Sequence, residues 1–159
     1  MTTNFLSPNE FRFNIKRLPE TSFYVQSVSL PSMTSSNIDL STPFTNLPIA
    51  SGKIEYSNLT VTCALDVKMK SYQEIRNWLR QISPDEDFTQ RIALEKSNEG
   101  IYSDATLHIL DNSKNSNIKI VFQDLFPIGI SEVMLETKNT SVPIIQVSYD
   151  FKYRIFNFV

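Results

Sequence analysis

The sequence predicts an α+β fold that is mostly β, a barrel or sandwich of strands with a flanking α-helix. Between Ile145 and Ile155 every odd residue is apolar or aromatic, and the even residues are polar or charged. The segment Leu59–Val67 alternates in the same way, whereas apolar residues between Tyr72 and Ile82 recur at helical spacing. Successive side chains of a strand point to opposite faces, and those of a helix return to one face every three or four residues. Strand patterns therefore outnumber helical patterns along the chain.

The first alternating segments are Phe11–Leu18 and Phe23–Leu30. The residues between them, Pro-Glu-Thr-Ser, are typical of a turn, so the two segments predict a β-hairpin. Pro31 follows directly, and proline cannot donate a hydrogen bond to a neighbouring strand. The pairing is therefore expected to end there.

The next segment, Ser32–Ser57, has no helical period and is rich in serine, threonine and asparagine, with Pro43, Pro48 and Gly52 within it. Loops longer than about 12–15 residues are uncommon in compact domains, and are usually functional or disordered. Apolar residues on such a segment mark a surface that packs against something else. The sequence therefore predicts a long loop or arm over residues 32–57 that lies against a neighbouring subunit. Its apolar residues are Ile38, Leu40, Phe44, Leu47, Ile49 and Ile54.

The strand Leu59–Val67 precedes a helix predicted over residues 71–83. Ser71 and Glu74 have the spacing of a capping box, in which each side chain bonds a backbone N–H of the first turn. The apolar stripe of this helix is expected to face the core. It comprises Tyr72, Ile75, Trp78, Leu79 and Ile82.

Pro84 is expected to end that helix and to open a second, weaker one. The segment Ser83–Glu86 places proline at the first helical position and acidic residues in the first turn, where they face the helix dipole. Ser97–Gly100 then closes the second helix. Two further strands are predicted at Tyr102–Asp111 and Asn117–Phe126.

The last third of the chain contains a predicted irregularity and the longest predicted strand. Pro127 and Gly129 are expected to break or bulge the preceding strand. A short strand is predicted at Val133–Lys138, and a long one at Ile144–Val159. That last segment is about twice the common strand length, which is typical of a barrel or of a sheet that neighbouring subunits extend.

Composition limits the classes of function. The length of 159 residues predicts a single domain, residues 1–159, and the net charge of -2 gives no electrostatic footprint for nucleic acid or an anionic membrane. Cys63 is the only cysteine, so no intramolecular disulfide can form. The start, Met1–Phe11, lacks the features of a signal peptide, and no apolar run reaches the length of a membrane span. We expect a protein that is made in a cytoplasm and stays soluble there.

The residues that could carry chemistry are few. The single histidine, His108, excludes a histidine-pair metal site, and three distant glycines exclude a phosphate-binding loop. Asp85, Glu86 and Asp87 are interpreted as helix-start acids, since paired catalytic carboxylates need contrasting environments. Cys63 alternates with apolar residues and is interpreted as buried. We therefore expect no catalytic, cofactor-binding or metal-binding residues.

Three segments carry a resemblance to a known family. They are Val28–Met33, the strand and tryptophan-bearing helix Tyr56–Leu79, and the run Leu107–Lys114 with its sequence Leu-His-Ile-Leu-Asp-Asn-Ser-Lys. With the long C-terminal strand they cover most of the chain from Phe11 to Phe158. The chain resembles the tail-tube superfamily of contractile-tailed bacteriophages. Within it, the chain most closely resembles the tail completion and sheath-stabiliser proteins, or tube terminators.

The resemblance implies a tail-tube-like domain that assembles as a homohexameric ring in the virion. The ring would end the tail tube at the head-proximal end and anchor the last sheath ring. It would contact tube, sheath and neck proteins, let DNA pass without specific binding, and need no membrane or small-molecule substrate. We expect its subunit interface to include Ile38, Leu40, Phe44, Leu47, Ile49, Asp150, Lys152 and Arg154.

Other functions stay open at this point. The tube subunit and the baseplate tube initiator share the same fold. A monomeric β-sandwich binding module would need exposed aromatic residues on a concave face, for which Tyr24, Tyr102 and Phe158 are candidates. An enzyme would need His108 in a cleft with a carboxylate such as Asp104 or Asp111.

Overall fold

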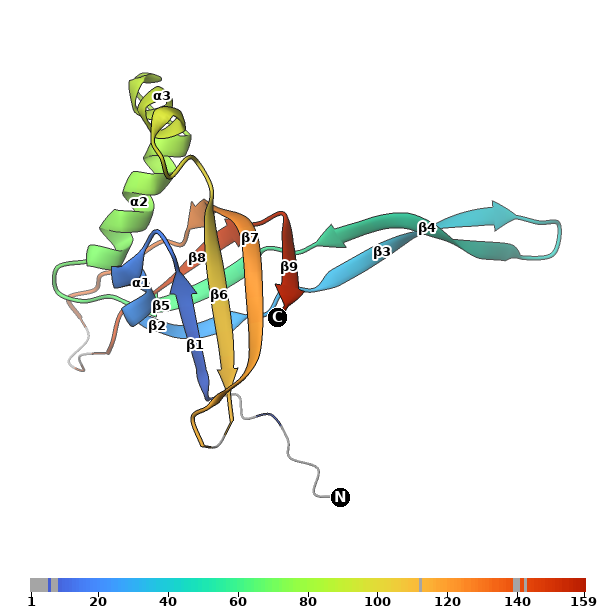
Figure 1. Cartoon of the computed structure of the whole chain (residues 1–159), viewed down its shortest axis with the longest axis horizontal. Helices are drawn as coiled ribbons and strands as arrows, with labels where there is room; N and C mark the ends of the chain where they lie inside the picture. Colours follow the sequence, from blue (N-terminus) through green and yellow to red (C-terminus); the bar gives the residue numbers. More distant parts are fainter. Residues whose placement is uncertain (1–5, 7–8, 112, 139–140, 142) are drawn as a thin grey trace.

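The computed structural model describes residues 6, 9–111, 113–138, 141 and 143–159, which form nine strands and three helices. The elements in chain order are β1 (Phe11–Ile15), α1 (Pro19–Phe23), β2 (Val25–Ser29), β3 (Met33–Ser41), β4 (Asn46–Tyr56), β5 (Leu59–Ala64), α2 (Lys70–Ile82), α3 (Thr89–Lys96), β6 (Ser103–Leu110), β7 (Ser116–Ile130), β8 (Gln146–Lys152) and β9 (Ile155–Phe158). Figure 1 shows a β-sheet body with α2 and α3 beside it, and a long hairpin of β3 and β4 that projects away. The expected fold class, α+β and mostly β, is confirmed.

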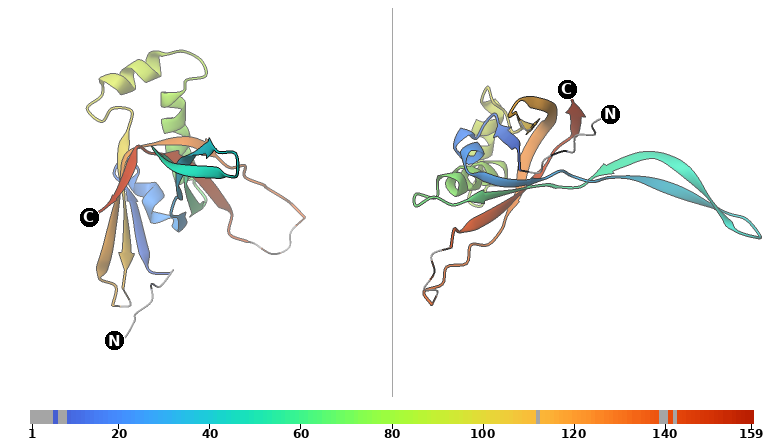
Figure 2. Two further views of the ribbon diagram at one scale, coloured as in Figure 1. Left: turned by 90° about the vertical axis from the view of Figure 1, so that its right-hand side faces the viewer. Right: turned by 90° about the horizontal axis from the view of Figure 1, so that it is seen from below.

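The body is one antiparallel sheet of seven strands in the order β1-β6-β7-β8-β5-β2, with β9 also paired to β7. Strand β7 has 15 residues; it pairs with β6 and β9 along its first part and with β8 along its last part. The sheet therefore bends over into two layers that share this strand (Figure 2). Within the described residues the sheet does not close into a barrel, because β1, β2 and β9 each pair with one strand only.

The predicted hairpin of Phe11–Leu18 and Phe23–Leu30 is wrong, although both segments contain a strand. β1 pairs with β6, and β2 pairs with β5. The residues between them form helix α1 instead of a turn. Thr21 in this helix is buried, and its backbone N–H and hydroxyl both donate to the Glu74 carboxylate. This contact holds the connection against α2 and leaves β1 and β2 at opposite edges.

The apolar stripe of α2 packs on the sheet as predicted, but the predicted capping box is wrong. Ile75 is fully buried and Trp78 is 2% exposed. The Ser71 hydroxyl lies 3.4 Å from the Tyr149 hydroxyl on β8, and the Glu74 carboxylate is bonded to α1. Partners from other elements therefore occupy both side chains that would form the box.

Helix α3 begins later than predicted, because residues 83–88 form no helix. Asp85 and Glu86 instead form ion pairs with Arg80 at the end of α2, at 2.8 and 3.6 Å. Their predicted place in the first turn of a helix is therefore wrong. The helix ends at Lys96, directly before the segment Ser97–Gly100 that was predicted to close it. Gly100 has a φ of +68°, in the left-handed region that favours glycine.

Strand β7 passes through the predicted irregularity as a bulge between Pro127 and Gly129, which confirms a bulge rather than a break. The predicted strand at Val133–Lys138 is wrong, since that segment has no strand pairing. The Ser148 backbone N–H donates to the Ser131 hydroxyl at 3.0 Å. The Ser131 hydroxyl thus accepts the hydrogen bond that a backbone carbonyl would accept in a continued strand, and the chain leaves the sheet after β7.

The predicted single strand Ile144–Val159 is also wrong, because a bend at Tyr153 and Arg154 separates β8 from β9. The Arg154 backbone N–H donates to the Gln123 carbonyl at 3.0 Å, and its guanidinium pairs with the Asp124 carboxylate at 2.9 Å. Both partners lie on β7. The bend moves the chain from one half of β7 to the other.

The hydrophobic core lies between the two layers and beneath α2. One face of β5 and the odd-numbered residues of β8 are fully buried, as their alternation predicts. Strand β5 ends at Ala64, earlier than predicted, and Val67 is fully exposed. The largest fully buried side chains include Trp78, Tyr149, Phe122, Phe151, Ile15 and Leu59.

Candidate subunit interface

The arm, defined here as Met33–Tyr56, is an antiparallel hairpin of β3 and β4 that extends far from the body (Figure 1). The predicted structureless loop is therefore corrected to a paired hairpin. Because β2 leads into β3 and β4 leads into β5, the arm continues the β2–β5 pair outward. At its tip, the Thr42 backbone N–H donates to the Thr45 carbonyl at 3.0 Å.

Apolar side chains gather on one face of the outer half of the arm. Ile38 lies opposite Ile49, and Leu40 lies opposite Leu47. Opposed residues and residues two apart in a strand share a face. Each of the four is 49% to 61% exposed, and Phe44 at the tip is 97% exposed. We call these five side chains the arm patch. The opposite face carries Asn37, Asp39, Ser41, Asn46, Pro48 and Ala50.

The base of the arm is fixed to the body. The Ser57 backbone N–H donates to the Ser32 carbonyl at 3.0 Å, and the Tyr153 hydroxyl donates to the Ser57 carbonyl at 3.0 Å. Tyr56 packs on Tyr153 and Phe156, with ring centroids 5.8 and 5.6 Å apart. Burial raises the pKa of Tyr153 to about 12, so this hydroxyl remains a donor at neutral pH. The arm therefore leaves the body in a fixed direction.

The three charged residues predicted for the interface lie on the body, away from the arm patch. The Asp150 carboxylate accepts a hydrogen bond from the Thr60 hydroxyl at 2.7 Å. The Lys152 ammonium donates to a carbonyl at the arm base at 3.5 Å, and Arg154 pairs with Asp124. Each thus has a partner within its own chain. The interface role of these three residues and of the arm patch stays a prediction.

Sequence reasoning missed a second apolar surface, on the connection between β7 and β8. Met134, Leu135 and Ile144 are 69%, 77% and 68% exposed, and Ile145 is 37% exposed. With Pro143 and polar neighbours, three of them line an open hollow of about 490 Å³. We call Met134, Leu135, Ile144 and Ile145 the loop patch. Its signal in the sequence is two pairs of adjacent apolar residues, and both pairs fall within predicted strands, Val133–Lys138 and Ile144–Val159.

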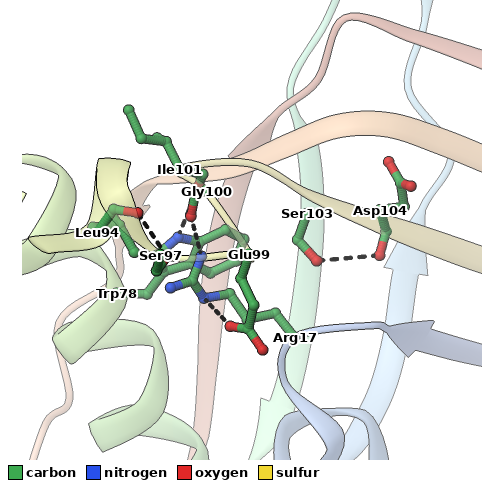
Figure 3. A network of polar contacts seen from close by, with 9 residues as sticks. All are labelled: Arg17, Trp78, Leu94, Ser97, Glu99, Gly100, Ile101, Ser103 and Asp104. Atoms are coloured by element: carbon green, nitrogen blue, oxygen red, sulfur yellow. Dashed lines mark hydrogen bonds and ion pairs between the residues drawn. The ribbon is translucent and has the colours of Figure 1, made fainter.

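A network around Arg17 fixes the chain between α3 and β6 to the body (Figure 3). The Arg17 guanidinium stacks over the Trp78 ring at 5.2 Å and donates to the Gly100 carbonyl at 2.8 Å. The Trp78 indole N–H donates to the Ile101 carbonyl at 3.1 Å. The exposed Glu99 carboxylate lies 3.9 Å from Arg17. This network sets the position of the helical pair beside the sheet.

The residues considered for catalysis do not come together. His108 Nδ1 lies 3.0 Å from the Ser116 hydroxyl, whereas the Asp111 carboxylate accepts backbone N–H groups of its own turn. Asp104 accepts the Asp124 backbone N–H at 3.3 Å. Cys63 is buried, and burial raises the pKa of its thiol to about 12, which disfavours the nucleophilic thiolate.

The described residues contain neither a cluster of metal ligands nor a helix that could span a membrane. No three His, Cys, Asp or Glu side chains in this part of the chain gather into a group that could hold a metal ion. None of the helices described above combines the length and apolar character that a membrane crossing requires.

Solved structures with the same fold come from contractile injection systems. The chain is similar to a chain of the anti-feeding prophage baseplate, with a TM-score of 0.70 and 13% identity over 100% of this chain and 97% of that one. It is similar to a chain in the sheath/tube terminator of an extracellular contractile injection system, PVC, with a TM-score of 0.65 and 9% identity over 100% and 99%. The chain is also similar to a chain of the anti-feeding prophage tube-terminating cap, with a TM-score of 0.64 and 9% identity over 100% of this chain and 93% of that one.

The family is shown by a sequence comparison. No curated protein matches the chain. The family model described as phage tail tube protein, however, matches residues 5–159, which is nearly the whole chain. The same residues form the layered sheet, the flanking helix α2 and the arm described above. The chain therefore belongs to the phage tail tube protein family.

Proposed function

We propose that this protein is a structural, non-enzymatic subunit that assembles as a hexameric ring and terminates the tail tube at its head-proximal end. In that position the ring stabilises the contractile sheath and joins the tail to the neck. Its partners are further copies of itself, the tube protein, the sheath protein and neck proteins. It acts in the virion tail after assembly in the host cytoplasm.

The observation that carries the proposal is the arm. An apolar face held far from the body at a fixed angle contributes nothing to the core of its own chain. Large exposed apolar patches on soluble proteins mark interaction sites. The chain belongs to a family of tube proteins, which makes another subunit the expected partner of the arm. Each subunit of a ring needs a surface that reaches its neighbour.

The terminal position is supported by the fold likeness to chains in the PVC terminator and the anti-feeding prophage cap. A second candidate is a tube initiator at the baseplate or a tube subunit. The baseplate chain favours it, since its TM-score of 0.70 is the highest of those given above. A monomeric binding module is a more distant candidate.

Passage of DNA through the ring fits the charge of the chain. The net charge is -2, and each cation that contacted a phosphate would add affinity for DNA. A conduit without a net positive charge lets a polyanion pass without holding it.

The first test is native mass spectrometry of the purified chain with negative-stain imaging, alone and with tubes of its own tail. The proposal expects hexameric rings that bind one tube end and stop further growth there. Incorporation along the whole tube would instead identify a tube subunit, and rings that nucleate tubes would identify an initiator. A chain that stays monomeric and never binds tube ends would favour the third candidate, the monomeric binding module.

A further inference from the structure

We propose that the arm patch of one copy docks on the loop patch of the next copy around the ring. This inference rests on the proposed ring and deepens it, because it names the surface that receives the arm. The two patches lie in separate segments, Met33–Tyr56 and the connection between β7 and β8.

The side chains of both patches are largely exposed in the single chain, by 49% to 97% in the arm patch and by 37% to 77% in the loop patch. More than half of the exposed large apolar side chains in the described residues lie on the arm or in the loop patch. The arm patch comprises aliphatic side chains and one phenylalanine, and the loop patch comprises a methionine and three aliphatic side chains. The side chains of the two patches are all uncharged, and contact between them would bury apolar surface. Glu136 lines the same hollow as the loop patch, so its carboxylate is expected to stay at the rim of the contact, where it keeps its water.

The two patches lie at opposite ends of the molecule. In the right-hand view of Figure 2 the arm extends to one side of the body, and the described parts of the β7–β8 connection, residues 131–138 and 143–145, extend to the other. One chain therefore cannot bring its own arm patch to its own loop patch. A contact between different surfaces of identical copies is heterologous, and it generates a ring when the rotation closes.

Length and anchoring also suit this contact. Strand β3 has 9 residues, and at about 3.3 Å per residue such a strand reaches about 30 Å from the body. The loop patch is tied to the sheet near its start and end. The Leu65 backbone N–H donates to the Ile145 carbonyl at 2.9 Å, and the Ser131 backbone N–H donates to the Ser148 carbonyl at 2.9 Å. Both surfaces are thus held by the body before they meet.

The test uses two double variants of the full chain. The arm variant carries Leu40→Asp and Ile49→Asp, and the loop variant carries Leu135→Asp and Ile144→Asp. All four positions are exposed, so both variants should keep the fold, which circular dichroism would check. Native mass spectrometry and negative-stain imaging then measure assembly, under the conditions in which the native chain forms rings.

We expect each variant alone to lose the ring. A mixture of the two should give a 1:1 dimer and no ring, because only the intact arm of one chain and the intact loop patch of the other can meet. A control, Ser41→Asp, places one such charge on the opposite face of the arm and should leave rings intact. Rings from the loop variant, or a mixture without the 1:1 dimer, would overturn the inference.

The two proposals fail separately. If the native chain and the loop variant both form rings while the arm variant does not, the ring stands and the docking site is wrong. If the native chain forms open filaments and the mixture still gives the 1:1 dimer, the docking site stands and the ring is wrong.

Discussion

At the scale of single residues, polar side chains near the core have partners from distant parts of the sequence. Arg17 is the clearest case, because its side chain is only 14% exposed and it joins the turn after β1 to the segment after α3. Its guanidinium stacks on the Trp78 ring and donates a hydrogen bond to the Gly100 carbonyl. A guanidinium on an aromatic face gains stability from both contacts.

We expect Arg17→Ala to lower the free energy of unfolding by about 1–3 kcal/mol, because the stacking and the bond to Gly100 are both lost. The matched control is Glu99→Gln, which removes only an exposed partner at 3.9 Å and should change stability by less than about 0.5 kcal/mol. Urea unfolding followed by Trp78 fluorescence measures both. Equal effects of the two variants would contradict this account of the network.

The buried thiol of Cys63 predicts a loss of stability in alkali. Its pKa is raised from 9.0 to about 12 by burial, so the unfolded chain releases this proton at lower pH than the folded one. The stability is complete below pH 9 and falls as the pH rises toward 12. The slope for this group is about 1.4 kcal/mol per pH unit.

The buried hydroxyls of Tyr149 and Tyr153 add to that loss only above their ordinary pKa of 10, because burial raises both to about 12. Cys63→Ala should therefore move the onset of alkaline destabilisation from about pH 9 to about pH 10. Urea unfolding at a series of pH values measures the onset. An unchanged onset would show that the thiol is not the first group to titrate.

Sequence reasoning at this scale identified burial better than hydrogen bonding. Cys63 and Trp78 are buried as their alternation and helical spacing predicted. Ser71, Glu74 and Asp85 were assigned local roles at helix starts, but each bonds to another element or another turn. Local spacing shows which bonds a side chain could make nearby, and it carries no information about competing partners far along the chain.

At the scale of elements, the arm is a pair of strands without a third strand to support it. Such two-stranded hairpins are marginally stable in water by themselves. The arm is held in place by its base, where Ser32, Ser57 and Tyr153 are hydrogen bonded. Its outer half therefore depends on the body for direction and on a neighbour for burial.

Deleting Thr34–Ala50 should leave a folded monomer that no longer forms rings. The buried core residues all lie outside this segment, so the free energy of unfolding should change by about 1 kcal/mol or less. Size-exclusion chromatography with light scattering measures the mass, and urea unfolding measures the stability. Rings that persist after the deletion would contradict the role of the arm in assembly.

The sequence predicted most strands but not how they pair. The bend at Tyr153 and Arg154 was hidden because Tyr153 is buried and the alternation of apolar and polar residues runs through it. The segments around Pro19 looked like a hairpin because they are adjacent, yet their partners are β5 and β6. Periodicity indicates which face of a strand is buried, whereas pairing depends on contacts between distant segments.

At the scale of the whole molecule, stability is uneven. The sheet around β5, β7 and β8 contains most of the fully buried side chains, whereas β3 and β4 pack chiefly on one another. Regions with few buried apolar contacts open at lower cost than the core. The five apolar residues of the arm patch are visible in the sequence because they interrupt a polar segment. The loop patch is hidden, because its residues fall within two predicted strands.

Hydrogen exchange should reveal this difference. In the isolated chain we expect amides of β3 and β4 to exchange at least about ten-fold faster than those of β5 and β8, since their bonds face water. In the assembled ring the arm amides should slow toward the rates of the body. Mass spectrometry of peptides from both states measures the change, and arm protection that is equal in the two states would argue against docking.

The long strand β7 has a mechanical consequence. It is the one strand common to both layers of the body, so a pulling force that enters through one layer reaches the other along covalent backbone. To separate the two layers, a force must break the backbone hydrogen bonds that β7 makes with the neighbouring strands of one layer. Under tension the molecule should yield first at the arm or at α3, and the joined layers should keep their shape.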